Sequence, residues 1–228
     1  MRLASRLDCR NSAELSQVFR QSRWRNSKQC QLAESPDPRR SLASTIIQAP
    51  GFVMTNRLFV ALVCVLFLVR LPSLAEPMGA DQGLYAYIGD RILHGDMPYR
   101  DAWDQKPPAV HFAYALMRAA WPHEPVVAGA DLLAALTIAW LLFALGSTVH
   151  TRAVGQIAAL LFLFLSNPAF LRLSGVSVRA QCETFIAAAV TAALLLVARS
   201  RGRSAMWTLL AAGGLMGVGA VFKYNAAI

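Results

Sequence analysis

The sequence predicts an all-α protein, a polytopic transmembrane helical bundle of about five spans. Apolar residues make up 56% of the 228-residue chain and charged residues only 15%, a composition typical of a chain whose solvent is largely lipid. The apolar residues also cluster in uncharged blocks. With a few flanking residues, each block reaches the roughly 20 residues that a helix needs to cross about 30 Å of hydrocarbon.

The five blocks without charged residues are residues 58–69, 132–151, 153–171, 184–198 and 204–222. A sixth candidate, residues 107–121, contains His111 and has an uncharged run only between Lys106 and Arg118. Because this run is too short to cross a bilayer, we expect a helix lying at the membrane interface, with Tyr114 and Trp121 at headgroup depth.

The distribution of basic residues predicts how the spans are oriented. If the N-terminal side of the first span faces the cytoplasm, five spans place inside the cations Arg57, Arg152, Arg199, Arg201 and Arg203. The same count places residues 76–125, residues 172–182 and Lys223 together on the outer face. Four charged residues of these segments can then meet there: Asp81, Lys106, Arg179 and Glu183.

Residues 1–53 differ in composition from the rest of the chain, residues 54–228. They contain nine basic and four acidic residues, which account for five of the nine net positive charges, and we expect no packed core there. The segment is a basic tail, a transit peptide or upstream sequence translated from a wrong start. The last is favoured because Met54 is followed at once by a polar triplet and an apolar helix, as in a bacterial inner-membrane protein. The basic pI therefore does not indicate nucleic-acid binding.

The four cysteines share no spacing typical of a metal site or a disulfide, and we assign no role to Cys9, Cys30, Cys64 and Cys182. The polar loop is more informative. Residues 81–94 have apolar side chains at helical spacing and predict a short amphipathic helix on the outer membrane surface, with Asp81 as N-cap and Gly95 at its end. Residues 97–99 are expected to be extended.

The end of the polar loop also has a readable local structure. Pro107 disfavours a helical conformation for Lys106, and the two prolines are typical of a helix start. We therefore expect Lys106 to be held on a stiff turn directly before the interfacial helix.

The order of motifs in the loop resembles one known family. Three motifs follow the first span, namely Asp81-Gln82-Gly83-x-Tyr85-x-Tyr87, Gly95-x-x-Pro98-Tyr99-x-Asp101-x-Trp103 and Gln105-Lys106-Pro107-Pro108. Together they resemble the GT-C superfamily of membrane glycosyltransferases, in the bacterial branch related to protein mannosyltransferases and the aminoarabinose transferase of lipid A. The stretch from Arg179 to Glu183 is similar to the family's Arg/Asn-x-x-Glu stretch. The resemblance covers residues 54–228.

This resemblance implies transfer of a sugar, with inversion, from a polyprenyl-phosphate donor to a hydroxyl of a glycan, lipid or protein acceptor outside the bacterial inner membrane. Asp81 would be the general base, and Lys106, with Arg179 or Arg100, would neutralise the departing phosphate. The family commonly has Asp-Glu where this chain has Asp81-Gln82, so a role that needs paired carboxylates is not expected here.

Other residues would bind the substrate if the resemblance holds. Aromatic side chains would stack on the sugar, and the polar loop would contribute further contacts; these residues are Tyr85, Tyr87, Tyr99, Trp103 and Gln105. Glu183 would hold sugar hydroxyls or bind a divalent cation, and the sequence does not decide whether a metal cofactor is needed.

Each assignment has a structural alternative. Asp81 could cap a helix, Lys106 could be an interfacial lysine that reaches toward water, and Glu183 could pair with Arg179 or Arg172. The tyrosines could form an aromatic belt. We expect structural positions for three further acids. Asp101 and Asp104 are expected to be solvated loop charges, and Asp131 is expected to face the bundle.

A different class of protein also fits part of the pattern. A polytopic transport or binding protein could use Asp81, Lys106 and Glu183 as a substrate gate, with Asn167-Pro168 and Gly213-Gly214 as helix breaks. The chain contains no evident inverted repeat, which would favour that class. Because GT-C enzymes have more than ten spans and this chain stops as the fifth span exits, we expect an N-terminal fragment of a transferase.

Overall fold

The computed structural model describes residues 54–170, 172–173, 176–200 and 205–224. The chain divides into two units, Met1–Gly51 and Phe52–Ile228, and every described residue belongs to the second. The predicted tail, transit peptide or mis-assigned start therefore lies outside the described residues, as do Cys9, Cys30, Arg201 and Arg203.

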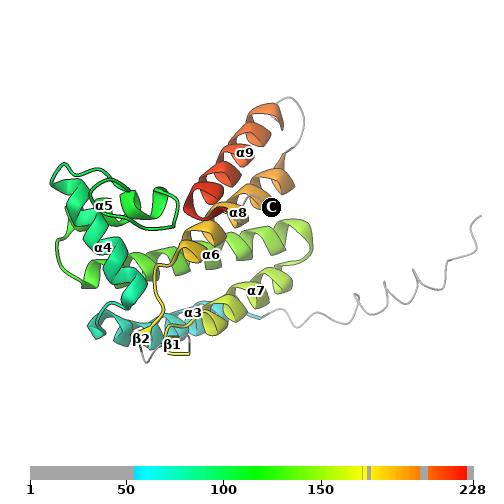
Figure 1. Cartoon of the computed structure of the whole chain (residues 1–228). Coiled ribbons are helices and arrows are strands. Elements are labelled where there is room, and N and C mark those ends of the chain that lie inside the picture. Colours follow the sequence, from blue (N-terminus) through cyan, green and yellow to red (C-terminus); the bar gives the residue numbers. More distant parts are fainter. Residues whose placement is uncertain (1–53, 171, 174–175, 201–204, 225–228) are drawn as a thin grey trace, which may run out of the picture. The chain divides into compact units, whose positions relative to one another are not determined.

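The described chain is helical apart from one very short hairpin (Figure 1). Its helices are α3 (Asn56–Arg70), the 3-10 helix η1 (Leu71–Ala75), α4 (Ala80–Leu93), α5 (Ala109–Ala120), α6 (Pro125–Val149), α7 (Arg152–Leu165), α8 (Cys182–Arg199) and α9 (Ala205–Phe222). The hairpin pairs β1 (Arg172–Leu173) with β2 (Val176–Ser177) in antiparallel register. The predicted all-α class is confirmed.

Four of the described helical segments are long and apolar enough to cross a membrane, which indicates an integral membrane protein. They are Asn56–Ala75, Pro125–Val149, Cys182–Arg199 and Ala205–Phe222. A helix also forms within the predicted span at residues 153–171, but α7 has only 14 residues, or about 21 Å of helix. It ends because Asn167 precedes Pro168, which disfavours the helical conformation, and the Asn167 side chain accepts the Ala169 N–H at 2.9 Å instead.

Contacts between helix ends show how the long helices run. Arg152 at the start of α7 donates to Asn56 at the start of α3 (2.6 Å), whereas Arg70 at the end of α3 donates to the Leu163 carbonyl near the end of α7 (3.2 Å). These two helices are therefore parallel. The α6–α7 and α8–α9 pairs are each joined by a short connection and pack closely, so successive long helices alternate in direction.

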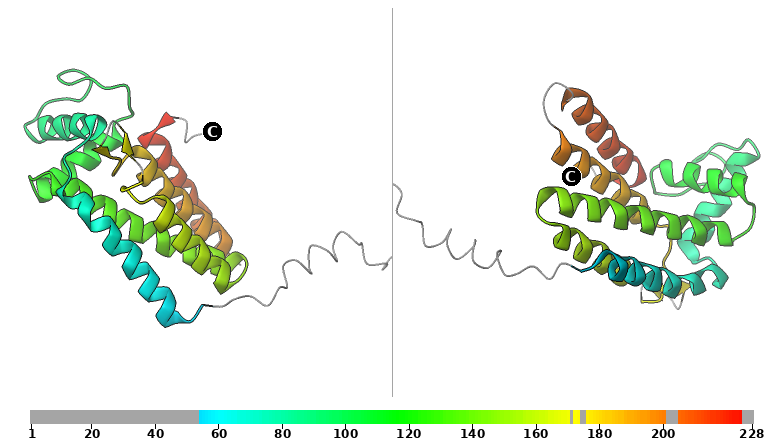
Figure 2. Two further views of the ribbon diagram at one scale, coloured as in Figure 1. Left: turned by 90° about the horizontal axis from the view of Figure 1, so that it is seen from below. Right: turned by 180° about the vertical axis from the view of Figure 1, so that it is seen from behind.

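The alternation gives this unit two ends with different residues. We call the end that carries Arg70, Asp131, Glu183 and Lys223 the polar end, and the end that carries Arg57, Arg152 and Arg199 the basic end. Helices α4 and α5 lie at the polar end, as two further views show (Figure 2).

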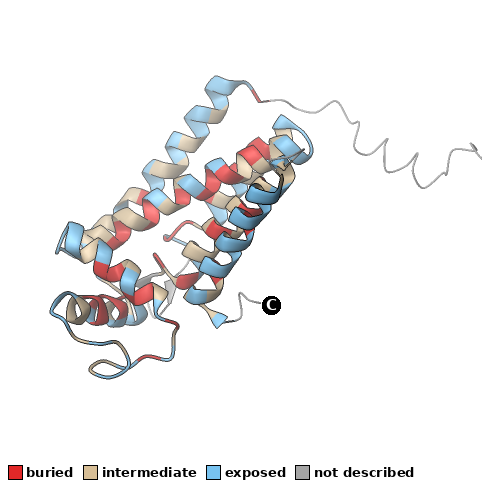
Figure 3. Cartoon of the chain, turned by 90° about the horizontal axis from the view of Figure 1, so that it is seen from above, coloured by how far each residue is buried: buried red, intermediate tan, exposed pale blue. Residues whose placement is uncertain are grey.

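Helix α6 is the centre of the packing. Buried residues follow its length, whereas α3 and α9 are largely exposed, as expected of helices that face lipid (Figure 3). The closest approach joins α6 to α7, where a Cβ added to Gly155 would lie 2.3 Å from the Phe143 carbonyl oxygen. Only a residue without a side chain fits there.

The two helices predicted in the polar loop form as α4 and α5 and pack on each other. A Cβ on Gly89 of α4 would lie 2.8 Å from the Ala115 nitrogen of α5, so the backbones nearly touch. Tyr114 is fully buried and donates to the Ala180 carbonyl oxygen at 3.1 Å. Tyr114 therefore packs inside the protein, while Trp121 is exposed, and a place for both at headgroup depth stays a prediction.

Candidate active site

The start of α4 sets the position of Asp81. The N-cap is Gly79, not Asp81 as predicted, and the side-chain oxygen Oε1 of Gln82 accepts the Gly79 N–H at 2.7 Å. Asp81 is instead an exposed residue of the first turn, where the helix dipole favours a negative charge. Because the Gln82 side chain makes the capping hydrogen bond, the Asp81 carboxylate is not needed as a helix cap. Its position is set by the first turn of α4.

Arg179 holds the connection that leads into α4. Its guanidinium donates to the main-chain carbonyls of Ser73, Glu76 (3.2 Å) and Pro77 (2.6 Å), and the residue is only 2% exposed. This arrangement does not favour the predicted phosphate contact, because both terminal nitrogens donate to the protein's own backbone. Arg179 is a structural clamp behind the site.

Gln82 joins this clamp to the helix start. Its side-chain nitrogen donates to the Arg179 carbonyl at 2.6 Å while its oxygen caps α4. An ionised glutamate could accept at the cap but could not donate to the carbonyl. The position where the resembling family commonly has a second acid is therefore occupied by an amide that uses both of its functions.

Asp131 of α6 links the end of α3 to the residues before α8 at the polar end. Its carboxylate pairs with Arg70 at 3.3 Å and accepts the Ala180 N–H at 2.7 Å, and both charged side chains are almost fully buried. The prediction that Asp131 faces the bundle is confirmed. Its partner is the cation at the end of α3, not one from the polar loop.

The middle of the polar loop is a tight turn. Tyr99 adopts a left-handed conformation (φ 68°), and its N–H donates to the Ala102 carbonyl at 2.7 Å, so the predicted extended stretch does not include Tyr99. Asp101 accepts the Met97 N–H at 2.8 Å and pairs with Arg100 at 2.6 Å. These contacts hold the pKa of Asp101 at about 2, and they engage Arg100 away from the predicted role in phosphate binding.

Lys106 is fixed from two sides. The Tyr99 hydroxyl donates to the Lys106 main-chain carbonyl at 2.7 Å, and the following Pro107 is buried at the start of α5. The predicted stiff turn thus gains a cross-loop hydrogen bond. The Lys106 side chain is partly exposed.

A buried acid and a buried histidine lie beneath this turn. Asp104 was predicted to be a solvated charge, but it is 7% exposed, accepts the Gln105 N–H at 2.7 Å and lies 3.5 Å from His111 Nε2. His111 is fully buried and meets Tyr85 and Tyr99 edge-on. Burial lowers the pKa of His111, and the charge of Asp104 opposes that effect.

The candidate active site lies in front of this framework. Lys223, directly after α9, donates to the Glu183 carboxylate in the first turn of α8. That bond and the charge of Glu183 raise the pKa of Lys223, with a further contribution from Asp81. The positive charge of Lys106 also interacts electrostatically with the Glu183 carboxylate. Lys223 therefore lies within electrostatic range of Glu183 and Asp81, and Glu183 lies within range of Lys106.

The predicted sugar-binding residues divide into buried and exposed ones. Tyr85 is 1% exposed, packs edge-on against His111 and Tyr114, and its pKa is raised mainly by burial, which does not favour its predicted stacking on the sugar. Exposed aromatic or polar surface remains at the loop residues Tyr87, Tyr99, Trp103 and Gln105.

Two residues of this region had no predicted role. Lys223 carried a weak signal, since it is the cation at the outer end of the fifth predicted span. His111 carried none, because a histidine in a short apolar helix is as compatible with the surface as with the core.

Among the described residues, no group of three or more histidine, cysteine or acidic side chains could hold a metal ion. The chain matches no protein-family model, no curated protein and no solved structure. Its function therefore has to be inferred from the geometry of the polar end.

Proposed function

We propose that this protein is a membrane glycosyltransferase that moves a sugar from a polyprenyl-phosphate donor to a hydroxyl of a glycan, lipid or protein acceptor. The observation that carries the proposal is the Glu183–Lys223 pair at the polar end, with Asp81 within electrostatic range of Lys223 and Lys106 within range of Glu183. Such a transfer needs one carboxylate to take a proton and cations to receive a phosphate. The motif order of the polar loop supports the same chemistry.

Asp81 is proposed as the general base. It takes the proton of the acceptor hydroxyl while the hydroxyl oxygen forms a bond to the anomeric carbon, and the bond from that carbon to the donor phosphate breaks. The electron pair leaves with the phosphate oxygen, and because the hydroxyl attacks from the face opposite the phosphate, the configuration is inverted. The exposure of Asp81 supports this role, and the Gln82 cap supports the orientation of the first turn of α4.

Lys106 and Lys223 are proposed to stabilise the departing phosphate. The clamp by Tyr99 and Pro107 supports the first of these, because a preorganised cation stabilises developing charge without having to be reoriented. Lys223 would share its charge between Glu183 and the phosphate, and Glu183 would also contact sugar hydroxyls. Arg179 is assigned to positioning the start of α4, and Arg100 to closing the loop turn.

The apolar helices give the donor its environment. A polyprenyl tail would lie in the bilayer beside them while its phosphate reaches the polar end. Cations at the basic end favour a cytoplasmic location for that end, so the active face would be periplasmic in a bacterial inner membrane. This proposal includes five segments that cross the membrane in alternating directions, of which α7 is the shortest. It also includes positions at the membrane interface for α4 and α5.

The test is sugar transfer by the full protein in membranes, measured with a radiolabelled polyprenyl-phosphate sugar. Asp81→Asn should lower transfer about 100-fold or more, because general base catalysis contributes 10²–10⁴-fold. Asp96→Asn is the matched control, since that acid of the same loop has a partly exposed pair with Arg91 at 2.6 Å and should leave transfer unchanged. Transfer near wild type in Asp81→Asn removes this residue as the base.

The alternative of a transport or binding protein is addressed by the same preparation. Its predicted helix break at Gly213-Gly214 is not seen, because α9 is continuous from Ala205 to Phe222. Uptake or binding of a lipid-linked sugar without formation of a new glycosidic bond would favour that class over the transferase.

A further inference from the structure

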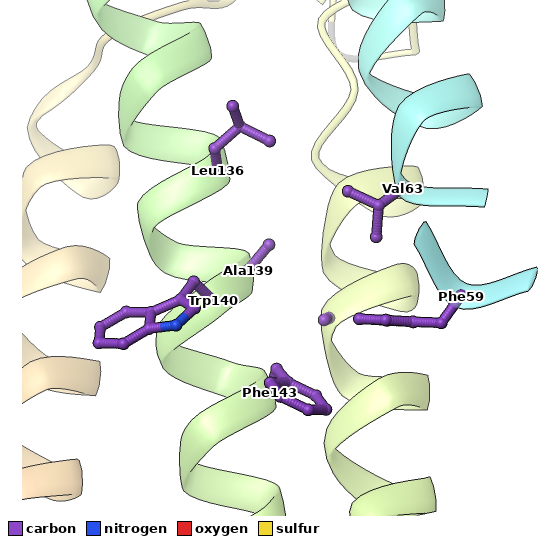
Figure 4. Close-up of a pocket in the computed structure, with 7 residues that line it drawn as sticks. Phe59, Val63, Leu136, Ala139, Trp140 and Phe143 are labelled. Carbon is purple, nitrogen blue, oxygen red and sulfur yellow. The ribbon is translucent and has the colours of Figure 1, made fainter. Parts of the chain in front are cut away.

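An apolar groove lies between α3 and α6, on the half of the helices near the basic end. Its volume is about 250 Å³, and it is lined by Phe59, Val63, Leu136, Ala139, Trp140, Phe143 and Ala159 (Figure 4). The groove forms because α3 packs mainly on α7 and touches α6 little, so that Ala159 of α7 lies between the two walls. It contains none of the residues of the candidate active site.

The walls are suited to a hydrocarbon chain. Phe59 and Phe143 stack at 5.3 Å between ring centroids and form the end of the groove nearest the basic end. Apolar cavities of about 150 Å³ stay dry and take up hydrocarbon ligands. A larger apolar groove that opens into a bilayer will therefore be filled by a lipid chain rather than by water.

The mouth of the groove is positively charged. The Arg152 guanidinium lies 5.9 Å from the centroid of the Phe143 ring and binds Asn56, the neighbour of Arg57. Helices α3 and α7 both start here without an acidic residue in the first turn, so their dipoles add to the positive potential. Residues 54–70 and 136–165, which include all the residues that line the groove, contain no Asp or Glu.

We propose that this groove binds one acyl chain of an anionic phospholipid from the leaflet at the basic end, with the lipid phosphate beside Arg152 and Arg57. Charge favours this occupant over a second copy of the chain. A copy in the same membrane orientation would bring the same cations to the same depth, where like charges repel. A phospholipid instead brings its negative charge to the cations and its chain to the apolar walls.

Native mass spectrometry of the full chain in detergent tests the proposal, with dioleoyl phosphatidylglycerol and dioleoyl phosphatidylcholine added at equal concentration. We expect one phosphatidylglycerol to be retained in preference to phosphatidylcholine. Leu136→Trp fills the groove and should abolish retention, and Val63→Phe should weaken it from the opposite wall. Leu133→Trp is the matched control, because Leu133 is an exposed residue one turn away on the same helix and does not line the groove.

The headgroup contact is tested separately. Arg152→Gln should lower phosphatidylglycerol retention about fivefold, as expected for one cation near a lipid phosphate, and should leave phosphatidylcholine unchanged. Arg199→Gln is its control, since this cation of the same end belongs to α8, which does not line the groove. Equal retention of both lipids, equal effects of Leu136→Trp and Leu133→Trp, or a protein dimer that Leu136→Trp dissociates would each overturn the proposal.

Discussion

At the polar end, the links are buried polar side chains, and two of these links join segments far apart in sequence. Arg70 and Asp131 connect α3 to α6, Arg179 and Gln82 connect the residues before α8 to α4, and Asp104 meets His111 beneath the loop. At the basic end, the helices are instead held together by close packing of small and aromatic residues. Gly155 admits the backbone of α6, and Phe59 stacks on Phe143.

The difference between the ends follows from what each must hold. Buried polar groups are costly unless each finds its partner, so the polar end is specified in detail and can hold acids and cations at fixed places. Close packing of small and aromatic residues needs no such pairing and leaves a groove that lipid can fill. We expect the polar end to be sensitive to charge and pH, and the basic end to be sensitive to volume.

The largest expected effect is at the polar end. Asp131→Leu leaves Arg70 as a buried, unpaired charge and should destabilise the protein by about 3–5 kcal/mol. Unfolding in detergent by a denaturant series measures this. The double variant Arg70→Met/Asp131→Leu is the control, because removal of both charges should recover most of the loss. If both variants unfold alike, the pair is not what holds this end.

The basic end should respond to added volume instead. Gly155→Val places side-chain atoms against the Phe143 carbonyl and should cost about 3 kcal/mol by overpacking. Gly213→Ala is the matched control, since nothing lies within 4 Å of the added Cβ, and it should be neutral or stabilising in a helix interior. Similar melting temperatures for the two variants would contradict a tight α6–α7 contact.

A subtler change separates charge from volume at the polar end. Gln82→Glu keeps the size of the side chain but sets a carboxylate against the Arg179 carbonyl, so we expect a loss of about 2 kcal/mol. Gln105→Glu, at an exposed position, should be neutral. Thermal unfolding compares the two, and an unchanged melting temperature in Gln82→Glu would show that the Arg179 link contributes little.

The smallest effect is a dependence on pH. Because the folded pKa of His111 is lowered by burial, its unfolded form binds protons first, below its ordinary pKa of about 6.5. The contribution of neutral His111 to the free energy of unfolding is therefore complete above that pH. It is lost as the pH falls toward the folded pKa, by at most about 1.4 kcal/mol per pH unit. Melting curves from pH 7.5 to 5 should show a smaller decline in His111→Gln, and identical declines would assign the dependence to other groups.

Local signals predicted the helices well because they depend on neighbours in the chain. The apolar blocks placed α3, α6, α8 and α9, and Pro107 with Pro108 placed the start of α5. The error in α7 has the same local origin, since the block continued to residue 171 while the Asn167-Pro168 pair ended the helix at Leu165. A proline inside an apolar block is a visible signal that composition alone overlooks.

The site was predicted less completely because partners are chosen by the fold. Asp81, Lys106 and Glu183 could be selected from the loop motif and from span parity. However, Arg179, Tyr85 and Asp104 were assigned to the substrate or to solvent, and burial gives them structural partners instead. Exposure of one side chain in an amphipathic helix depends on what packs against it, which the local sequence does not contain.

By itself, the sequence determined that this chain is a membrane protein of apolar helices with one polar loop between the first two. Composition and periodicity suffice for that, because lipid accepts only long runs of apolar, internally hydrogen-bonded backbone. Tertiary structure alone decided which charges are buried in pairs and which face outward. It also decided where α3 and α6 part to leave a groove, since both depend on contacts between residues distant in the chain.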